Sequence, residues 1–146
     1  MKKILIAIDY DPTAKKVAEE GFSLAKEMNA KVILLHVVSN PVLYYSTYMV
    51  IAPSQIKSND ELKAISQIFL DKSKHDLGDD NIQTIVKEGD IAESILETAR
   101  DLEVDIIVLG THSRKWLEDI LMGSVAENAL KHTTLPLFII PTKKQE

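Results

Sequence analysis

The segment that follows Gly110 carries the residues best suited to bind an anion. It leads through polar residues to Gly123 and Ser124, and Glu127 follows three positions later. Serine and glutamate at this spacing form a capping box, which predicts a helix that begins here with free amide groups at Gly123, Ser124 and Val125. Such amides bind phosphate, and a glycine beside them allows close approach. The spacing therefore predicts a phosphate site.

The same residues also have a purely structural explanation. Strand, loop and helix units of doubly wound proteins commonly use a glycine to leave the strand and a serine to cap the helix. Taken alone, the pattern leaves both interpretations open.

Gly110, Ser113 and Gly123-Ser124 resemble the nucleotide loop of universal stress proteins. In that family, glycine, two residues, glycine, nine residues, glycine and serine or threonine wrap a triphosphate; Ser113 stands in place of the second glycine. The resemblance covers the whole chain, through KKILIAID, KVILLHVV and GSVAENALKHTTLPLFIIP. It implies a homodimer that binds ATP, ADP or AMP, with Mg²⁺ accompanying the nucleotide.

Composition indicates a single domain, which we assign to residues 1–146, because 45% hydrophobic content is enough for one core. The net charge is −5, and the clearest basic runs, Lys2-Lys3 and Lys143-Lys144, lie at the ends. The sequence has no stripe of basic residues that could follow a nucleic-acid backbone, so nucleic acid is disfavoured as a partner. The absence of cysteine excludes disulfides and thiolate metal sites.

The first ten residues, MKKILIAIDY, do not match a secretory signal. Their apolar run is short, Asp9 and Asp11 interrupt it, and no small-residue cleavage site follows. No segment reaches the length of a membrane span. We therefore expect a cytoplasmic protein without membrane contact.

Apolar strands alternate with amphipathic helices along the chain, which predicts an α/β fold. The expected strands are Ile4–Ile8, Val32–Val38, Ile82–Lys87, Val104–Leu109 and Leu135–Ile140. The expected helix starts are Asp11-Pro12, Ser58, Asp90 and Ser124. This alternation predicts a doubly wound, Rossmann-like sheet of five parallel strands in the order 3-2-1-4-5, with helices on both faces.

The two outer strands of this sheet differ in character. The third strand alternates polar and apolar residues, and the last contains Pro136, which a central strand does not tolerate because proline lacks an amide donor. Leu135–Ile140 is apolar and carries no charge to protect it, so we expect it to pair antiparallel with its own copy in a homodimer.

The order of the strands predicts where a ligand binds. Ligands of such sheets occupy the crevice at the switch point, here bordered by Asp9, Val37 and Gly110. Asp9 can bond a ribose hydroxyl, help to hold a metal beside phosphates, or cap the turn that follows it. The resemblance favours the nucleotide, and it implies that main-chain groups at Val37 face the adenine, with Ala7 lining the same crevice.

Side chains of the loop itself add further candidates. Ser113 and Arg114 offer a hydroxyl and positive charge near phosphate, although Arg114 is equally explained as part of a solvated surface. His112 lies inside the loop, where it can contact phosphate. None of the four histidines has the spacing or carboxylate neighbours of a zinc site, so we assign no metal ligand among them.

Other classes of nucleotide protein are disfavoured. The chain has neither a P-loop motif nor a dinucleotide-binding glycine motif after its first strand. A phosphoacceptor domain needs an aspartate after strand 3 and a lysine after strand 5, where this chain has Glu88-Gly89 and Pro141. No nucleophile with a matching base is visible, so a dedicated enzyme is not expected.

The remaining hypotheses are three. The first is an adenine-nucleotide-dependent switch or scaffold; the second is a family member that acts only through protein contacts; the third is a slow ATPase or phosphotransferase. A tyrosine-rich segment, residues 39–59, belongs to none of the expected elements. Its apolar residues predict that it covers a neighbouring helix, a dimer partner or a ligand.

Overall fold

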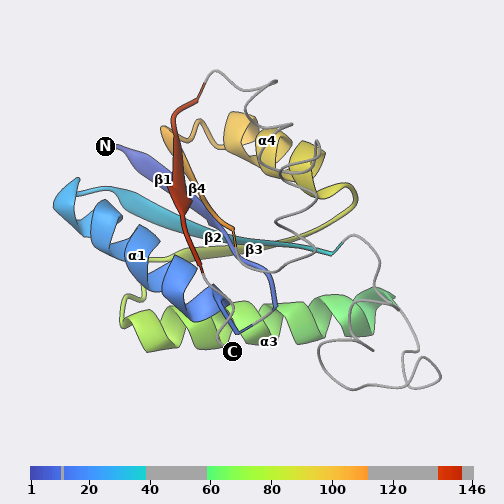
Figure 1. Cartoon of the computed structure of the whole chain (residues 1–146). Helices are drawn as coiled ribbons and strands as arrows, with labels where there is room; N and C mark the ends of the chain where they lie inside the picture. The colour runs from blue at the N-terminus through green and yellow to red at the C-terminus, as the bar shows by residue number, and fades with distance from the viewer. Residues whose placement is uncertain (11, 39–58, 112–134, 143–146) are drawn as a thin grey trace.

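The computed structural model describes residues 1–10, 12–38, 59–111 and 135–142, and Figure 1 shows the whole chain. Six of the candidate site residues lie outside the described residues, namely His112, Ser113, Arg114, Gly123, Ser124 and Val125. The helix expected at Ser124 and residues 39–58 of the tyrosine-rich segment also lie outside them.

Five strands and three helices are defined within the described residues. They are β1 (Lys3–Ala7), α1 (Ala14–Glu27), β2 (Lys31–Val38), α3 (Asn59–Leu77), β3 (Gln83–Glu88), α4 (Ile91–Asp101), β4 (Ile106–Gly110) and β5 (Leu137–Ile140). All strand pairs are parallel, and the order is β3-β2-β1-β4-β5. The predicted fold class and strand order are confirmed.

The sheet lies between two helical layers, with α1 and α3 on one face and α4 on the other (Figure 1). Successive side chains of a strand point to opposite faces, so each central strand contributes to both layers of the core. Ile4, Ile6 and Val108 pack with Val17 of α1 on the first face. The opposite face packs against α4 through a set that includes Leu5, Ile33, Leu35, Ile95 and Ile107.

Two of the predicted helix signals are confirmed by the structure. Asp90 caps α4, because its carboxylate accepts the amide proton of Glu93 at an N···O distance of 2.9 Å. Asn29 ends the α1 region with φ of 52°, the left-handed conformation that asparagine tolerates.

The predicted start of the first helix is wrong. Thr13 occupies the N-cap position and α1 begins at Ala14, whereas the sequence placed the cap at Asp11 and the first helical residue at Pro12. The first helical hydrogen bond joins the Val17 amide to the Thr13 carbonyl at 3.2 Å. Pro12 therefore belongs to the turn between β1 and α1, since a proline suits a turn as well as a first helical position.

The predicted start of the last strand is wrong by two residues. β5 begins at Leu137, so Pro136 lies just before the strand rather than within it. The Pro136 carbonyl still accepts the Ile107 amide at 3.0 Å, a bond that needs no donor from proline. The edge position of β5 is confirmed, and so is that of the more polar β3.

None of the helices in these described ranges is both long and apolar enough to cross a membrane.

Candidate functional site

The carboxyl ends of β1, β2 and β4 meet at one edge of the sheet. Ala7 pairs with Leu35, and the Ile8 amide continues the ladder by donating to the Leu35 carbonyl at 2.9 Å. At the same offset, Asp9 lies level with Val37 of β2. The chain thus brings together two residues that are far apart in sequence, at the place where open parallel sheets bind ligands.

β4 reaches the same edge on the other side of β1. Ile6 pairs with Val108, so Gly110 lies level with Ile8 by the same offset. The switch point between β1 and β4 is therefore bordered by Asp9 and Gly110. Thr111, the first residue after β4, is held beside β5 by its amide, which donates to the Ile140 carbonyl at 3.1 Å.

Asp9 is almost completely buried at this edge, with 6% of its surface exposed. Its Oδ1 accepts the amide proton of Tyr10 at 2.9 Å, so the carboxylate caps the turn after β1. The sequence left this role open beside a role toward a ligand. A carboxylate has lone pairs for several donors, so the two roles are compatible.

Ala7 and Val37 contribute their side chains to the core. Val37 is buried, and Ala7 is half-buried as the last residue of β1. Both pack on the α4 face of the sheet. Recognition by these residues would therefore use their main-chain groups, as expected for Val37.

Gly110 has a structural reason to be glycine. Its backbone lies outside the left-handed region, so conformational freedom does not explain it. A Cβ built on Gly110 would collide with Cγ2 of Val17, because α1 crosses β4 at this point. The glycine allows close packing of helix against strand.

We predict that Gly110→Ala destabilises the protein by about 1–3 kcal/mol, the usual cost of overpacking a core. Val17→Ala in the same chain should recover part of the loss, because it removes the colliding atom. Urea denaturation of the two single variants and the double variant measures this coupling. Strictly additive losses would contradict the proposed collision.

His36 lies near the carboxyl edge of the sheet, and the sequence analysis considered it only as a metal ligand. It lies fully buried in β2, and its Nδ1 is 3.0 Å from the Ile8 carbonyl oxygen. A carbonyl only accepts hydrogen bonds, so Nδ1 carries the proton. The ring also meets Phe69 of α3 at 5.5 Å, edge to face, and Phe69 contacts Tyr10 at 4.6 Å.

This histidine of β2 contacts α3 and the main chain of Ile8, the residue before Asp9. The sequence signal was a polar residue inside the apolar run ILLHVV, because a buried polar side chain requires a hydrogen-bond partner. Burial lowers the pKa of His36, while the Ile8 carbonyl and the charge of Asp9 act in the opposite direction to a smaller extent. Neutral His36 thus fixes the main chain that leads into the candidate site.

We predict that the free energy of unfolding falls as the pH drops below 6.5, the ordinary pKa of histidine. Between that value and the lowered pKa of His36, the unfolded chain binds a proton that the folded chain excludes, so stability rises with pH there. The slope from one such group reaches about 1.4 kcal/mol per pH unit.

Denaturation of the wild type, His36→Asn and His75→Asn tests this expectation. The measurements cover roughly pH 5 to 8, the range in which histidine titrates. Only His36→Asn should flatten the slope, because His75 is exposed on α3. Equal slopes in all three proteins would refute the assignment.

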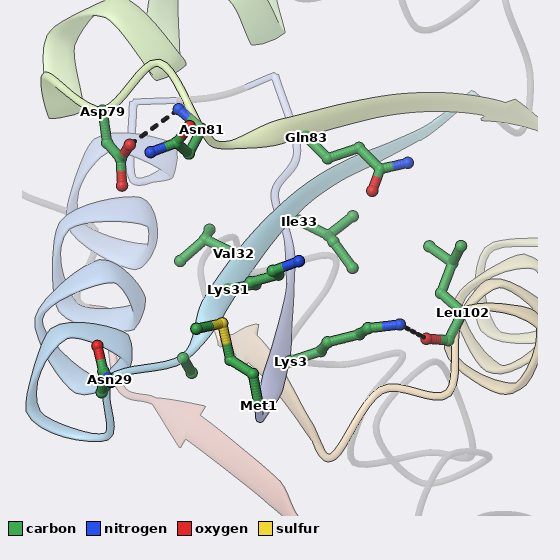
Figure 2. A pocket seen from close by; sticks show the side chains of 11 residues that line it. Met1, Lys3, Asn29, Lys31, Val32, Ile33, Asp79, Asn81, Gln83 and Leu102 are labelled. Carbon is green, nitrogen blue, oxygen red and sulfur yellow. Dashed lines mark hydrogen bonds between the residues drawn. The ribbon is translucent and has the colours of Figure 1, made fainter.

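A polar cavity of about 510 Å³ opens at the opposite, amino edge of the sheet (Figure 2). Polar groups of its lining form hydrogen bonds within the surrounding turns and between neighbouring elements. Lys3 Nζ donates to the Leu102 carbonyl at 2.9 Å, and the Asn81 amide donates to Asp79 at 2.9 Å. Ligands of open parallel sheets bind at the carboxyl edge, so we do not place the functional site here.

Comparison with known proteins identifies the family and agrees with the fold. The sequence model of the Universal stress protein family matches residues 1–141. The chain belongs to this family. Universal stress protein MJ0531 of Methanocaldococcus jannaschii is 30% identical, with 99% of this chain and 85% of that protein covered. Universal stress protein YxiE of Bacillus subtilis is 29% identical, with 94% and 97% covered.

Solved structures of universal stress proteins and related chains share this fold. The structure of the hypothetical protein MJ0577 superposes with a TM-score of 0.73 at 27% identity, over 99% of this universal stress protein and 98% of the other chain. A universal stress protein in complex with cAMP gives a TM-score of 0.65 at 18% identity, over 95% of both chains. One from Archaeoglobus fulgidus in complex with dAMP gives 0.62 at 18% identity, over 96% and 98%.

Proposed function

We propose that this universal stress protein binds ATP or a related adenine nucleotide and acts in the cytoplasm as a ligand-dependent switch or scaffold. The observation that carries the proposal is the meeting of Asp9, the Val37 backbone and Gly110 at the switch point of the sheet. This is where doubly wound sheets bind nucleotides.

Each part of the site has a proposed role. Asp9 accepts a hydrogen bond from a ribose hydroxyl or faces Mg²⁺ beside the phosphates, and main-chain groups at Val37 meet the adenine edge. Ala7 lines the same crevice through its main-chain groups. The amides of Gly123, Ser124 and Val125 would hold phosphate, as the N-terminus of a helix does.

Three side chains of the loop complete the proposed phosphate site. Ser113 offers a hydroxyl, Arg114 a charged donor and His112 a ring nitrogen. The cAMP and dAMP complexes of other universal stress proteins support an adenine nucleotide as the ligand class. At 18% identity these complexes share the fold with this chain. Binding of an adenine nucleotide by this chain is our proposal.

We propose binding rather than efficient catalysis. Asp9 is the only acid that we suspect of a catalytic role, and it already caps a turn. Turnover of ATP should therefore stay far below the roughly 1–100 s⁻¹ of kinases. Sustained hydrolysis that disappears in Asp9→Asn would favour the slow ATPase instead.

A second candidate is a family member that has lost nucleotide binding and works through protein contacts. Ser113 favours it, because serine stands where the family loop has glycine. If this position needs a positive φ, serine costs on the order of 1 kcal/mol and narrows the loop.

Ser113→Gly tests both candidates. We predict that it tightens ATP binding roughly fivefold, which corresponds to the strain it removes. Isothermal calorimetry with ATP and Mg²⁺ measures the change. Weaker binding in the variant would show that the serine hydroxyl contacts the ligand, and absence of binding in both proteins would favour the second candidate.

We also propose that two copies pair through β5. Phe138 and Ile139 expose 39% and 38% of their surfaces on this edge strand. A strand edge with apolar side chains and no protective charge favours pairing with another strand. A two-fold axis beside β5 would satisfy both edges at once.

A further inference from the structure

The hydrogen-bond ladder between β1 and β2 ends earlier than its regular pattern predicts. Its last bond runs from the Ile8 amide to the Leu35 carbonyl at 2.9 Å. The next bond of a parallel ladder would join the Val37 amide to the Ile8 carbonyl. Pairing stops at Ala7 and Leu35 instead, and within the described parts of the two strands no main-chain bond joins Val37 to Ile8.

The side chain of His36 takes the place of the missing donor. Its Nδ1 donates to the Ile8 carbonyl at 3.0 Å, and this carbonyl is the acceptor that Val37 would use in a continuous ladder. The ring is fully buried, and Phe69 of α3 meets it edge to face at 5.5 Å. Because a buried carbonyl requires a donor, the histidine satisfies Ile8 without a bond from Val37.

The direction of the Val37 amide follows from the same pattern. Alternate residues of a strand in a parallel sheet bond to the same neighbouring strand. Leu35 bonds toward β1, so Val37, two residues later, directs its amide toward the end of β1. There the chain turns away from the sheet at Asp9, whose carboxylate accepts the Tyr10 amide proton. The Val37 amide therefore faces the carboxyl edge at which we place the ligand.

We propose that His36 is a positioning residue for the adenine base, because its bond to the Ile8 carbonyl keeps the Val37 amide available to a ring nitrogen. The proposal rests on the function proposed above, in which main-chain groups at Val37 meet the adenine edge. Adenine has an acceptor nitrogen on either side of its amino group, N1 or N7, and a main-chain amide is a suitable donor to either. An apolar residue in place of His36 would let the Val37 amide close onto the Ile8 carbonyl.

A histidine with a purely structural role would behave differently. Loss of its buried hydrogen bond would lower stability and weaken the binding of every nucleotide to the same extent. A positioning histidine changes the recognition of a single ring nitrogen. The decisive readout is therefore the difference in affinity between ATP and an analogue that lacks one nitrogen, since this difference isolates one hydrogen bond.

Calorimetry with Mg²⁺ and ATP, 1-deaza-ATP or 7-deaza-ATP measures this difference. One of the two analogues should bind the wild type about tenfold more weakly than ATP, because it lacks the nitrogen that accepts the Val37 amide proton. The difference should disappear in His36→Leu. It should persist in His36→Asn, which keeps a donor near the position of Nδ1, and in His75→Leu, the same substitution at an exposed position of α3.

NMR of the protein without nucleotide tests the arrangement itself. Scalar coupling across a hydrogen bond from the Val37 amide to the Ile8 carbonyl should be absent in the wild type and present in His36→Leu. His36→Gln, whose longer side chain places its amide beyond the position of Nδ1, replaces His36→Leu if circular dichroism shows that the latter does not fold.

Two results would overturn the proposal. One is this coupling in the wild type, and the other is a difference between ATP and its analogue that survives in His36→Leu. A wild type that lacks the coupling and binds no nucleotide would refute the proposed function, and with it the role of His36 toward the base.

Discussion

Replacing Gly123 with valine is expected to abolish ATP binding at micromolar concentrations. The branched side chain would keep phosphate away from the amides that the proposed helix start presents. Loss of two hydrogen bonds to a charged group costs about 3 kcal/mol or more, which corresponds to at least about 100-fold in affinity. Calorimetry with ATP and Mg²⁺ measures the effect.

Gly78→Val provides the matched control for this variant. Gly78 follows α3, which ends at the amino edge of the sheet, far from the proposed site at the carboxyl edge. Its φ of 75° is in the left-handed region, so valine at this position strains the backbone. It should lower stability and leave ATP affinity unchanged. An unchanged affinity in Gly123→Val would show that phosphate is bound elsewhere.

Replacing Phe138 with aspartate is expected to convert the proposed β5 dimer into monomer. The substitution puts a charge on an exposed apolar edge that would be buried between the two strands. An unpaired buried charge costs about 3–5 kcal/mol, which raises the dissociation constant at least about 100-fold. Light scattering at concentrations where the wild type is dimeric measures the mass.

Ile140 must stay unchanged in this experiment. It is buried in the core beside α1, so a charge there would test folding rather than pairing. Gln83→Asp on the opposite edge strand, β3, is the control and should remain dimeric. A wild type that is monomeric at high concentration would contradict pairing through β5.

Much of the fold was predictable because the residue patterns of β1, β2 and β3 indicate whether each strand is central or at an edge. β1 and β2 read as continuous apolar runs since both faces are covered, whereas β3 alternates because it lies at an edge. Asp90 was predictable as a cap because its role depends only on the residues next to it. Local signals of this kind do not depend on packing.

Positions that depend on packing were less accessible to sequence analysis. Gly110 was predicted from the phosphate motif, but its packing role depends on Val17, which reaches it only when α1 crosses β4. The link from His36 to the Ile8 carbonyl depends likewise on the β1 and β2 register. Pro12 was misplaced because proline favours a turn and a helix start almost equally.

Equilibrium dialysis of the purified protein against ATP and Mg²⁺ tests the central proposal most directly. Mass spectrometry of the freshly purified protein then identifies any nucleotide that accompanies it. We predict saturable retention of adenine nucleotide that Gly123→Val removes and Gly78→Val preserves. Failure of the wild type to retain ATP, ADP or AMP would contradict nucleotide binding and leave a protein that acts through its contacts alone.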